Sequence, residues 1–221
     1  MKPLRFLAFF IFLISTFIPA ASASAHQPIW GDEGGVTRVP NLVTSYAYYR
    51  DLPADEVHVY TFEGKKGREF RAGMQIPALE GLKDYAVTMA IMGPGLPEAN
   101  HDQLPPEHPE ELGALVIQSW KSEDFFEPFT QTLYWGRQSV GLNLPADGTY
   151  YILVWQPEGV PGKYVMDTGY TEDFGVEAIF LMPVWWVRVH LFFGHDAYLL
   201  GGVVLISATG GFFILRRRRK K

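Results

Sequence analysis

The stretch LPADGTYYILVW (residues 144–155) starts with a Pro and Asp-Gly turn and runs on into consecutive aromatic and aliphatic residues. Pro, Asp and Gly favour turns, whereas Tyr, Ile, Val and Trp favour β-strands. A second strand-like run, residues 162–166, follows a loop rich in Pro and Gly. The sequence therefore predicts that strands 149–155 and 162–166 pair across this loop.

Similar runs occur upstream, each short and bounded by turn residues. The further predicted strands are 56–62, 68–74, 84–92, 112–120 and 132–144. Short strands at regular spacing are typical of sandwiches and barrels. No useful length of helical periodicity precedes Ala178. We therefore expect an all-β, antiparallel sandwich over residues 26–180.

Part of the chain resembles the bacterial pre-peptidase C-terminal domains. The residues that carry the resemblance are 59–64, 66–67, 93–95, 144–154 and 162–164, within about residues 55–166. The resemblance implies a jelly-roll-like β-sandwich. Members of that family usually accompany secreted peptidases, and some bind calcium or polymeric substrates. It implies no activity here, because this sequence shows neither a peptidase part nor a calcium-ligand set. Residues 26–28 and 169–174 are also similar to segments of uncharacterised membrane-tethered exported proteins.

The N-terminus has the three parts of a secretory signal peptide. Lys2 and Arg5 precede a mostly apolar run, and small residues follow at 21–25. A doubled A-x-A pattern allows cleavage after Ala23 or after Ala25. The alternative is an uncleaved anchor. We expect residues 1–25 to be a signal peptide and the domain that follows to be exported.

The C-terminus predicts a single transmembrane helix at 197–215. These nineteen residues carry no charge, and at ~1.5 Å per residue they span about 28 Å, close to a hydrocarbon core of roughly 30 Å. A basic tail follows, made of Arg216, Arg217, Arg218, Arg219, Lys220 and Lys221. Such a tail stays in the cytoplasm. The predicted location is the plasma membrane, single-pass, with the sandwich outside.

Small residues in the predicted helix suggest a packing face. Ser207 and Gly211 are four residues apart, as in small-xxx-small helix pairs. This spacing predicts a partner helix or an oligomer; the alternative is ordinary membrane-helix composition. A sorting tail removed during anchoring is a further alternative, although no LPxTG-like motif stands just before the helix.

The segment 181–196 is too short and too polar to span a bilayer, yet it is rich in aromatic residues. Trp185 and Trp186 suit the headgroup layer of a membrane, and Arg188 and His190 suit lipid phosphates or water. We therefore predict an interfacial helix in contact with membrane lipid.

Charge and composition exclude several functional classes. Between His26 and Asp196 there are eleven basic and twenty-four acidic residues, a net charge of −13. Such a body repels phosphate backbones, which argues against nucleic-acid binding. The chain has no cysteine, so disulfides, thiolate metal sites and a cysteine nucleophile are excluded.

His26 is the sharpest metal candidate. Cleavage after Ala25 would leave its α-amine and ring free to chelate copper, completed by a second histidine among His58, His101 and His108. The alternative is that His26 merely follows a cleavage site. Acidic clusters at 107–111 and 123–127 offer calcium ligands without a dedicated loop spacing. The main expectation is no cofactor, with copper and calcium as alternatives.

Motifs of the common catalytic families are absent from the sequence. Trp120, Tyr134, Trp135 and Trp155 have aromatic rings for stacking on sugars, but alternation favours most of them as core. The leading hypothesis is a non-enzymatic binding or scaffolding module of the cell envelope, acting through protein or glycan contacts. The alternative hypothesis is a copper-binding protein using His26.

Overall fold

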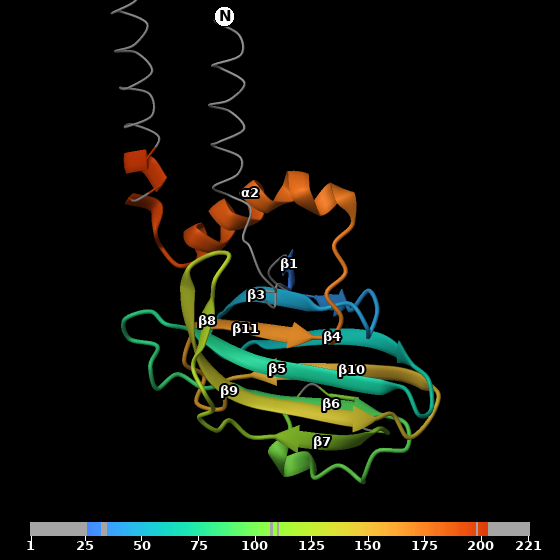
Figure 1. Ribbon diagram of the computed structural model, residues 1–221. Coiled ribbons are helices and arrows are strands. Elements are labelled where there is room, and N and C mark those ends of the chain that lie inside the picture. The colour runs from blue at the N-terminus through green and yellow to red at the C-terminus, as the bar shows by residue number, and fades with distance from the viewer. Residues whose placement is uncertain (1–25, 32–34, 107, 110, 198, 203–221) are drawn as a thin grey trace, which may run out of the picture.

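The computed structural model describes residues 26–31, 35–106, 108–109, 111–197 and 199–202. They form two facing β-sheets, and a long helix, α2 (Val176–Phe192), lies over the outer side of one sheet (orange in Figure 1). The all-β sandwich predicted from the sequence is confirmed. The predicted signal peptide lies outside the described residues.

One sheet has six strands in the order β1-β3-β11-β5-β9-β8. Their bounds are β1 Gln27–Trp30, β3 Tyr46–Leu52, β5 Glu69–Pro77, β8 Phe125–Glu127, β9 Thr132–Asn143 and β11 Gly162–Thr168. All neighbouring pairs are antiparallel except β1 with β3, which is parallel. A register shift between Gly73 and Gln75 marks a bulge in β5.

The other sheet has five strands in the order β2-β4-β10-β6-β7. Their bounds are β2 Val36–Arg38, β4 Val57–Gly64, β6 Thr88–Gly93, β7 Gly113–Ile117 and β10 Gly148–Trp155. A short 3₁₀ helix, η1 (His101–Gln103), lies in the loop between β6 and β7. Here too one edge pair, β2 with β4, is parallel. The prediction of a wholly antiparallel sandwich is therefore wrong at both N-terminal edge strands.

The predicted hairpin between 149–155 and 162–166 is wrong. Strand β10 pairs with β4 and β6, whereas β11 pairs with β3 and β5 in the opposite sheet. Strand β10 is apolar on both faces, whereas β11 is apolar toward the core and carries Lys163 and Asp167 beside Val165 on its outer face. Residues 156–161 are long enough to cross the ~10 Å between packed sheets. Local sequence therefore could not distinguish a hairpin from a crossover.

Aromatic side chains dominate the space between the sheets. Phe62 stacks on Phe70 across the sheets at 4.8 Å between ring centroids and on Tyr150 within its own sheet at 5.4 Å. Aromatic pairs at such distances add to the energy of area burial. This packing places Phe62 of β4 and Tyr150 of β10 in the core between the sheets.

A polar link also joins the sheets. The Tyr164 hydroxyl on β11 bonds to His58 Nδ1 at 2.8 Å and to the Tyr60 hydroxyl at 2.7 Å, both on β4. Burial, and secondarily the charge of Arg50, lowers the pKa of His58 to about 4. His58 is therefore a neutral member of the core, which explains why a histidine sits in an alternating strand.

Candidate functional site

One face of helix α2 is docked on the six-stranded sheet. Val189, Phe192 and Phe193 are buried against Tyr49 of β3 and Tyr134 of β9. The Phe192 ring meets the Tyr49 ring edge-on at 5.3 Å, and the Phe193 ring meets that of Tyr134 at 5.2 Å. These contacts fix the C-terminal half of the helix to the sandwich.

The other face of α2 is both apolar and exposed. We call Phe180, Val184, Val187 and Leu191 the outer strip, with exposed fractions of 78%, 52%, 40% and 49%. Their spacing of four, three and four residues places them on one side of a helix. Exposed apolar patches of this kind mark contact with a membrane or another protein.

The four residues predicted to contact lipid all lie on or beside this helix. Trp185 packs against Phe174 at 6.4 Å between rings, and Trp186 against His190 at 4.0 Å. The exposed Arg188 places its guanidinium 4.7 Å from the Trp30 ring centre. Each of the four therefore has a contact with the protein, and the most exposed apolar positions are those of the outer strip. Their predicted contact with lipid stays a prediction.

A histidine pair marks the end of α2. His190 Nδ1 lies 2.8 Å from His195 Nδ1. Burial lowers the pKa of His190, His195 lowers it further, and the Thr130 backbone opposes both effects. Burial and His195 therefore favour the uncharged His190 ring, whereas the Thr130 backbone, in the turn between β8 and β9, favours the charged one.

Most of the predicted membrane anchor lies outside the described residues. Residues 197 and 199–202 are helical, while Ser207, Gly211 and the basic tail fall beyond them. Within the part of the chain that the structure describes, each helix is too short or too polar to cross a bilayer.

His26 lies in a cleft of about 510 Å³ on the outer side of the six-stranded sheet. Its Nδ1 contacts the Ser45 hydroxyl. The cleft also holds Asp167, whose carboxylate lies against Gly73, where any Cβ would meet it at 2.5 Å. Burial raises the pKa of Asp167, and the nearby His26 opposes this rise. The cleft thus combines a carboxyl and an imidazole that are both partly buried.

The histidines proposed to complete a copper site have other partners. His58 bonds to Tyr164, and His101 Nδ1 lies 2.7 Å from His108 Nε2. No group of three or more His, Asp or Glu residues suited to a metal occurs among the described residues, a set that leaves out Glu107 and Glu110. Copper and calcium therefore stay predictions.

The four aromatic residues considered for sugar stacking differ in their burial. Tyr134 and Trp155 are buried and Trp135 packs against the core, so these three are structural. Trp120 follows β7 and is 48% exposed. Only this ring, among the four, presents an open face to solvent.

Comparisons with known proteins concern the fold. No protein-family model matches the chain, and no curated protein matches it. Among solved structures, it is similar to Aeromonas hydrophila PliG, a periplasmic inhibitor of g-type lysozyme, at 14% identity, over 66% of this chain and 98% of that one, with a TM-score of 0.38.

Two further structures are similar over most of their length. The pre-peptidase C-terminal domain of Bacillus anthracis collagenase matches at 12% identity over 62% of this chain and 96% of that one, with a TM-score of 0.33. CorA, a surface-associated copper-binding protein from Methylomicrobium album BG8, matches at 9% over 62% and 98%, with a TM-score of 0.34. The family that the sequence resembles is thus among the matches, and scores this low carry no inference about ligand or activity.

Sequence reasoning missed the outer strip and the partly buried Asp167. Every residue of the strip is apolar, but so are the residues of the docked face, and only the packing separates the two. Asp167 lies in β11, one residue past the end of the strand predicted at 162–166. One usable signal was Gly73, a glycine inside a strand, which often marks a bulge or a close approach.

Proposed function

We propose that this chain is a non-enzymatic binding or scaffolding module of the cell envelope, anchored in the plasma membrane with its sandwich outside. The observation that carries the proposal is the two-sided helix α2. Its inner face holds the sheet through Val189 and Phe192, while its outer strip offers only apolar side chains to the surroundings. A helix lying flat in the interface would bury this strip among lipids.

The sequence at both ends supports the same placement. A signal peptide exports the domain, the uncharged run 197–215 begins after the short segment 193–196 that follows α2, and six cations hold the last residues inside. The acidic body then lies outside the cytoplasm. Because α2 is rigidly docked, the sandwich has a fixed orientation on the membrane and presents the same faces to partners in the envelope.

Site-specific labelling tests the lipid contact. The chain contains no cysteine, so a single introduced cysteine carries the only label. In full-length protein in lipid vesicles, an environment-sensitive dye on Val184→Cys should report an apolar setting and be quenched by quenchers within the bilayer. The matched control is Gln103→Cys, exposed on η1 over the other sheet, whose dye should stay in water. Equal, water-like emission from both labels would refute the lipid contact.

The orientation is tested in intact cells with a membrane-impermeant maleimide. Gln103→Cys should react without lysis, whereas Lys221→Cys in the tail should react only after lysis. The reverse pattern would place the body inside, and the proposal would fail.

A further inference from the structure

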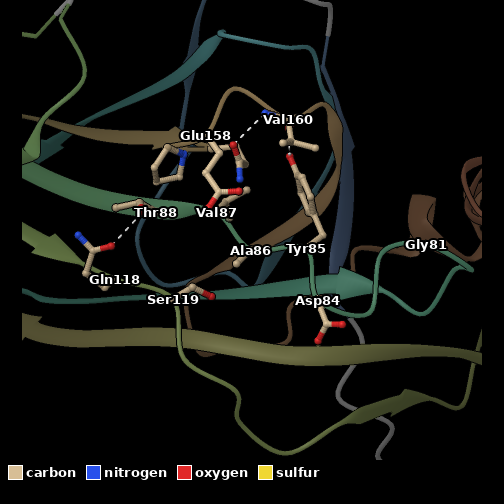
Figure 2. A pocket seen from close by; sticks show the side chains of 12 residues that line it. Gly81, Asp84, Tyr85, Ala86, Val87, Thr88, Gln118, Ser119, Glu158 and Val160 are labelled. Carbon is tan, nitrogen blue, oxygen red and sulfur yellow. Dashed lines mark hydrogen bonds between the residues drawn. The ribbon is translucent and has the colours of Figure 1, made fainter.

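A cleft with both polar and apolar walls opens where three loops from both sheets meet. Its walls come from the loop between β5 and β6, the residues after β7 and the loop between β10 and β11 (Figure 2). Its volume is about 400 Å³, in the range of roughly 300–1,000 Å³ that is usual for small-molecule sites. The cleft is separate from α2 and from the His26 cleft, with which it shares no lining residue.

The walls of this cleft are held in place by the protein itself. Arg137 of β9 donates to the Lys83 carbonyl at 2.7 Å and to the Tyr85 carbonyl at 3.1 Å. The Tyr85 hydroxyl donates to the Val160 carbonyl at 3.3 Å, and the Gln156 side-chain oxygen accepts from the Val160 N–H at 2.9 Å. These bonds tie two of the loops together, so a ligand would meet a site already formed.

Several polar groups in the cleft have bonding capacity to spare. Gln118 uses its amide oxygen to accept from the Thr88 hydroxyl at 3.2 Å (dashed in Figure 2), and Gln156 uses its own for Val160. Neither amide NH₂ group makes a hydrogen bond within the described residues. The Ser119 hydroxyl oxygen is buried, again with no partner among them. An unmade bond at a buried group is costly, and a ligand that supplies it gains affinity.

The charges around the cleft disfavour anions. The Glu158 side chain extends toward Val87 and Thr88 (Figure 2), and the Asp84 carboxylate is paired with Lys121 at 3.0 Å. Amide NH₂ groups donate, hydroxyls both donate and accept, and carboxylates accept. A ligand that matches this mixture carries many hydroxyl groups and no charge.

The exposed Trp120 directly follows Ser119 in the chain. Aromatic rings supply a flat apolar face beside polar groups, which suits the C–H face of a sugar ring. We infer that the cleft binds a neutral oligosaccharide, with Gln118, Gln156 and Ser119 bonding its hydroxyls. Trp120 does not line the cleft, so its ring would contact only a sugar unit that extends beyond Ser119. The inference rests on the proposed function and names the ligand class of the binding module.

Calorimetric titration of the full-length protein in lipid nanodiscs tests this inference. The probes are cellotetraose, maltotetraose and chitotetraose, with a heparin tetrasaccharide as the anionic comparison. At least one neutral probe should bind saturably at roughly millimolar concentration or below, and heparin should not. Gln118→Leu should weaken binding about five- to tenfold, the loss expected for one or two hydrogen bonds. Gln103→Leu, a matched change on η1, should have no effect.

Ser119→Ala separates ligand binding from folding. Because the Ser119 hydroxyl has no partner among the described residues, its removal should leave the thermal midpoint unchanged or higher while weakening saccharide binding. Saturable binding of none of the neutral probes would overturn the inference, as would equal affinities of Gln118→Leu, Ser119→Ala and the wild type. The dye on Val184→Cys in the full-length protein distinguishes the two failures. If no neutral probe binds while the dye reports lipid, only the cleft inference fails. If the dye reports water, the proposed membrane contact fails.

Discussion

The two sheets are covered on their outer sides by different kinds of structure. The six-stranded sheet is covered by helix α2, whose free side is the apolar outer strip. The five-stranded sheet is covered by the loop of residues 94–112, which buries Leu104 and Leu112 against it and leaves polar residues such as Glu98 and Asp102 exposed. Both covers therefore protect a sheet, but only the helical one remains apolar on its free side. Under the proposed membrane contact, the helical side would face lipid and the loop side would face water.

The largest effect is expected from removing a side chain that docks the helix. Phe192→Ala deletes a buried ring in contact with Tyr49 and Trp30 and should lower the free energy of unfolding by about 3–5 kcal/mol. Denaturant unfolding measures the loss, and amide hydrogen exchange should show α2 losing protection before the core strands.

Leu104→Ala is the matched change under the loop cover and should cost about 2–3 kcal/mol, within the range for buried leucines. In the Leu104→Ala variant, amide hydrogen exchange should become faster in residues 94–112 and stay unchanged in α2. A uniform increase over the whole sandwich in both variants would mean that the covers are not independent units.

The next effect concerns His58 in the polar link between the two sheets, which lies inside the sandwich and away from α2 and the loop 94–112. His58 has a folded-state pKa of about 4, against about 6.5 when unfolded. The unfolded chain therefore binds a proton first, and stability present above pH 6.5 is lost as the pH falls toward 4, by about 3 kcal/mol. The measurement is unfolding free energy against pH, for the wild type and for His58→Gln. The variant should lack this component; parallel profiles would contradict the assignment.

The smallest effect is expected at the base of the loop cover. A Cβ on Gly113 would meet the Leu96 carbonyl oxygen at 2.3 Å, so Gly113→Ala must push the loop outward. We expect a loss of about 1–3 kcal/mol, measured by denaturant unfolding, and faster proteolysis within 94–112. The dye on Val184→Cys should be unaffected. A change in that signal would show that the two covers are coupled.

Much of the sandwich was readable from alternation and turn residues. Strands β4, β5, β9 and β10 match runs predicted from the sequence. The short strands β1, β2 and β8 were not predicted, because three or four residues carry too little periodicity. The pairing of β10 and β11 was not readable either, since both strands have an apolar core-facing side and residues 156–161 can either close a hairpin or cross between the sheets.

The candidate sites were less accessible to sequence reasoning. An interfacial helix was predicted from Trp185 and Trp186, yet the most exposed positions belong to Phe180 and its neighbours, because docking decides which apolar residues face out. The cleft beside Gln118 collects residues from three separate loops, between Gly81 and Val160. Such a site has no local motif, and only the crossing of the chain between the sheets brings its parts together.

The parallel edge strands have a consequence for self-association. Unpaired strand edges template the addition of further chains. Here β1 and β2, from the first residues of the domain, occupy one border of each sheet, so the opposite borders are β8 with three residues and β7 with five. Strand β8 covers only Thr132–Tyr134 of the longer β9, so the rest of β9 is the part of this border with the most backbone available to a neighbouring copy. A strand added by a neighbouring copy should therefore pair with this part of β9 first.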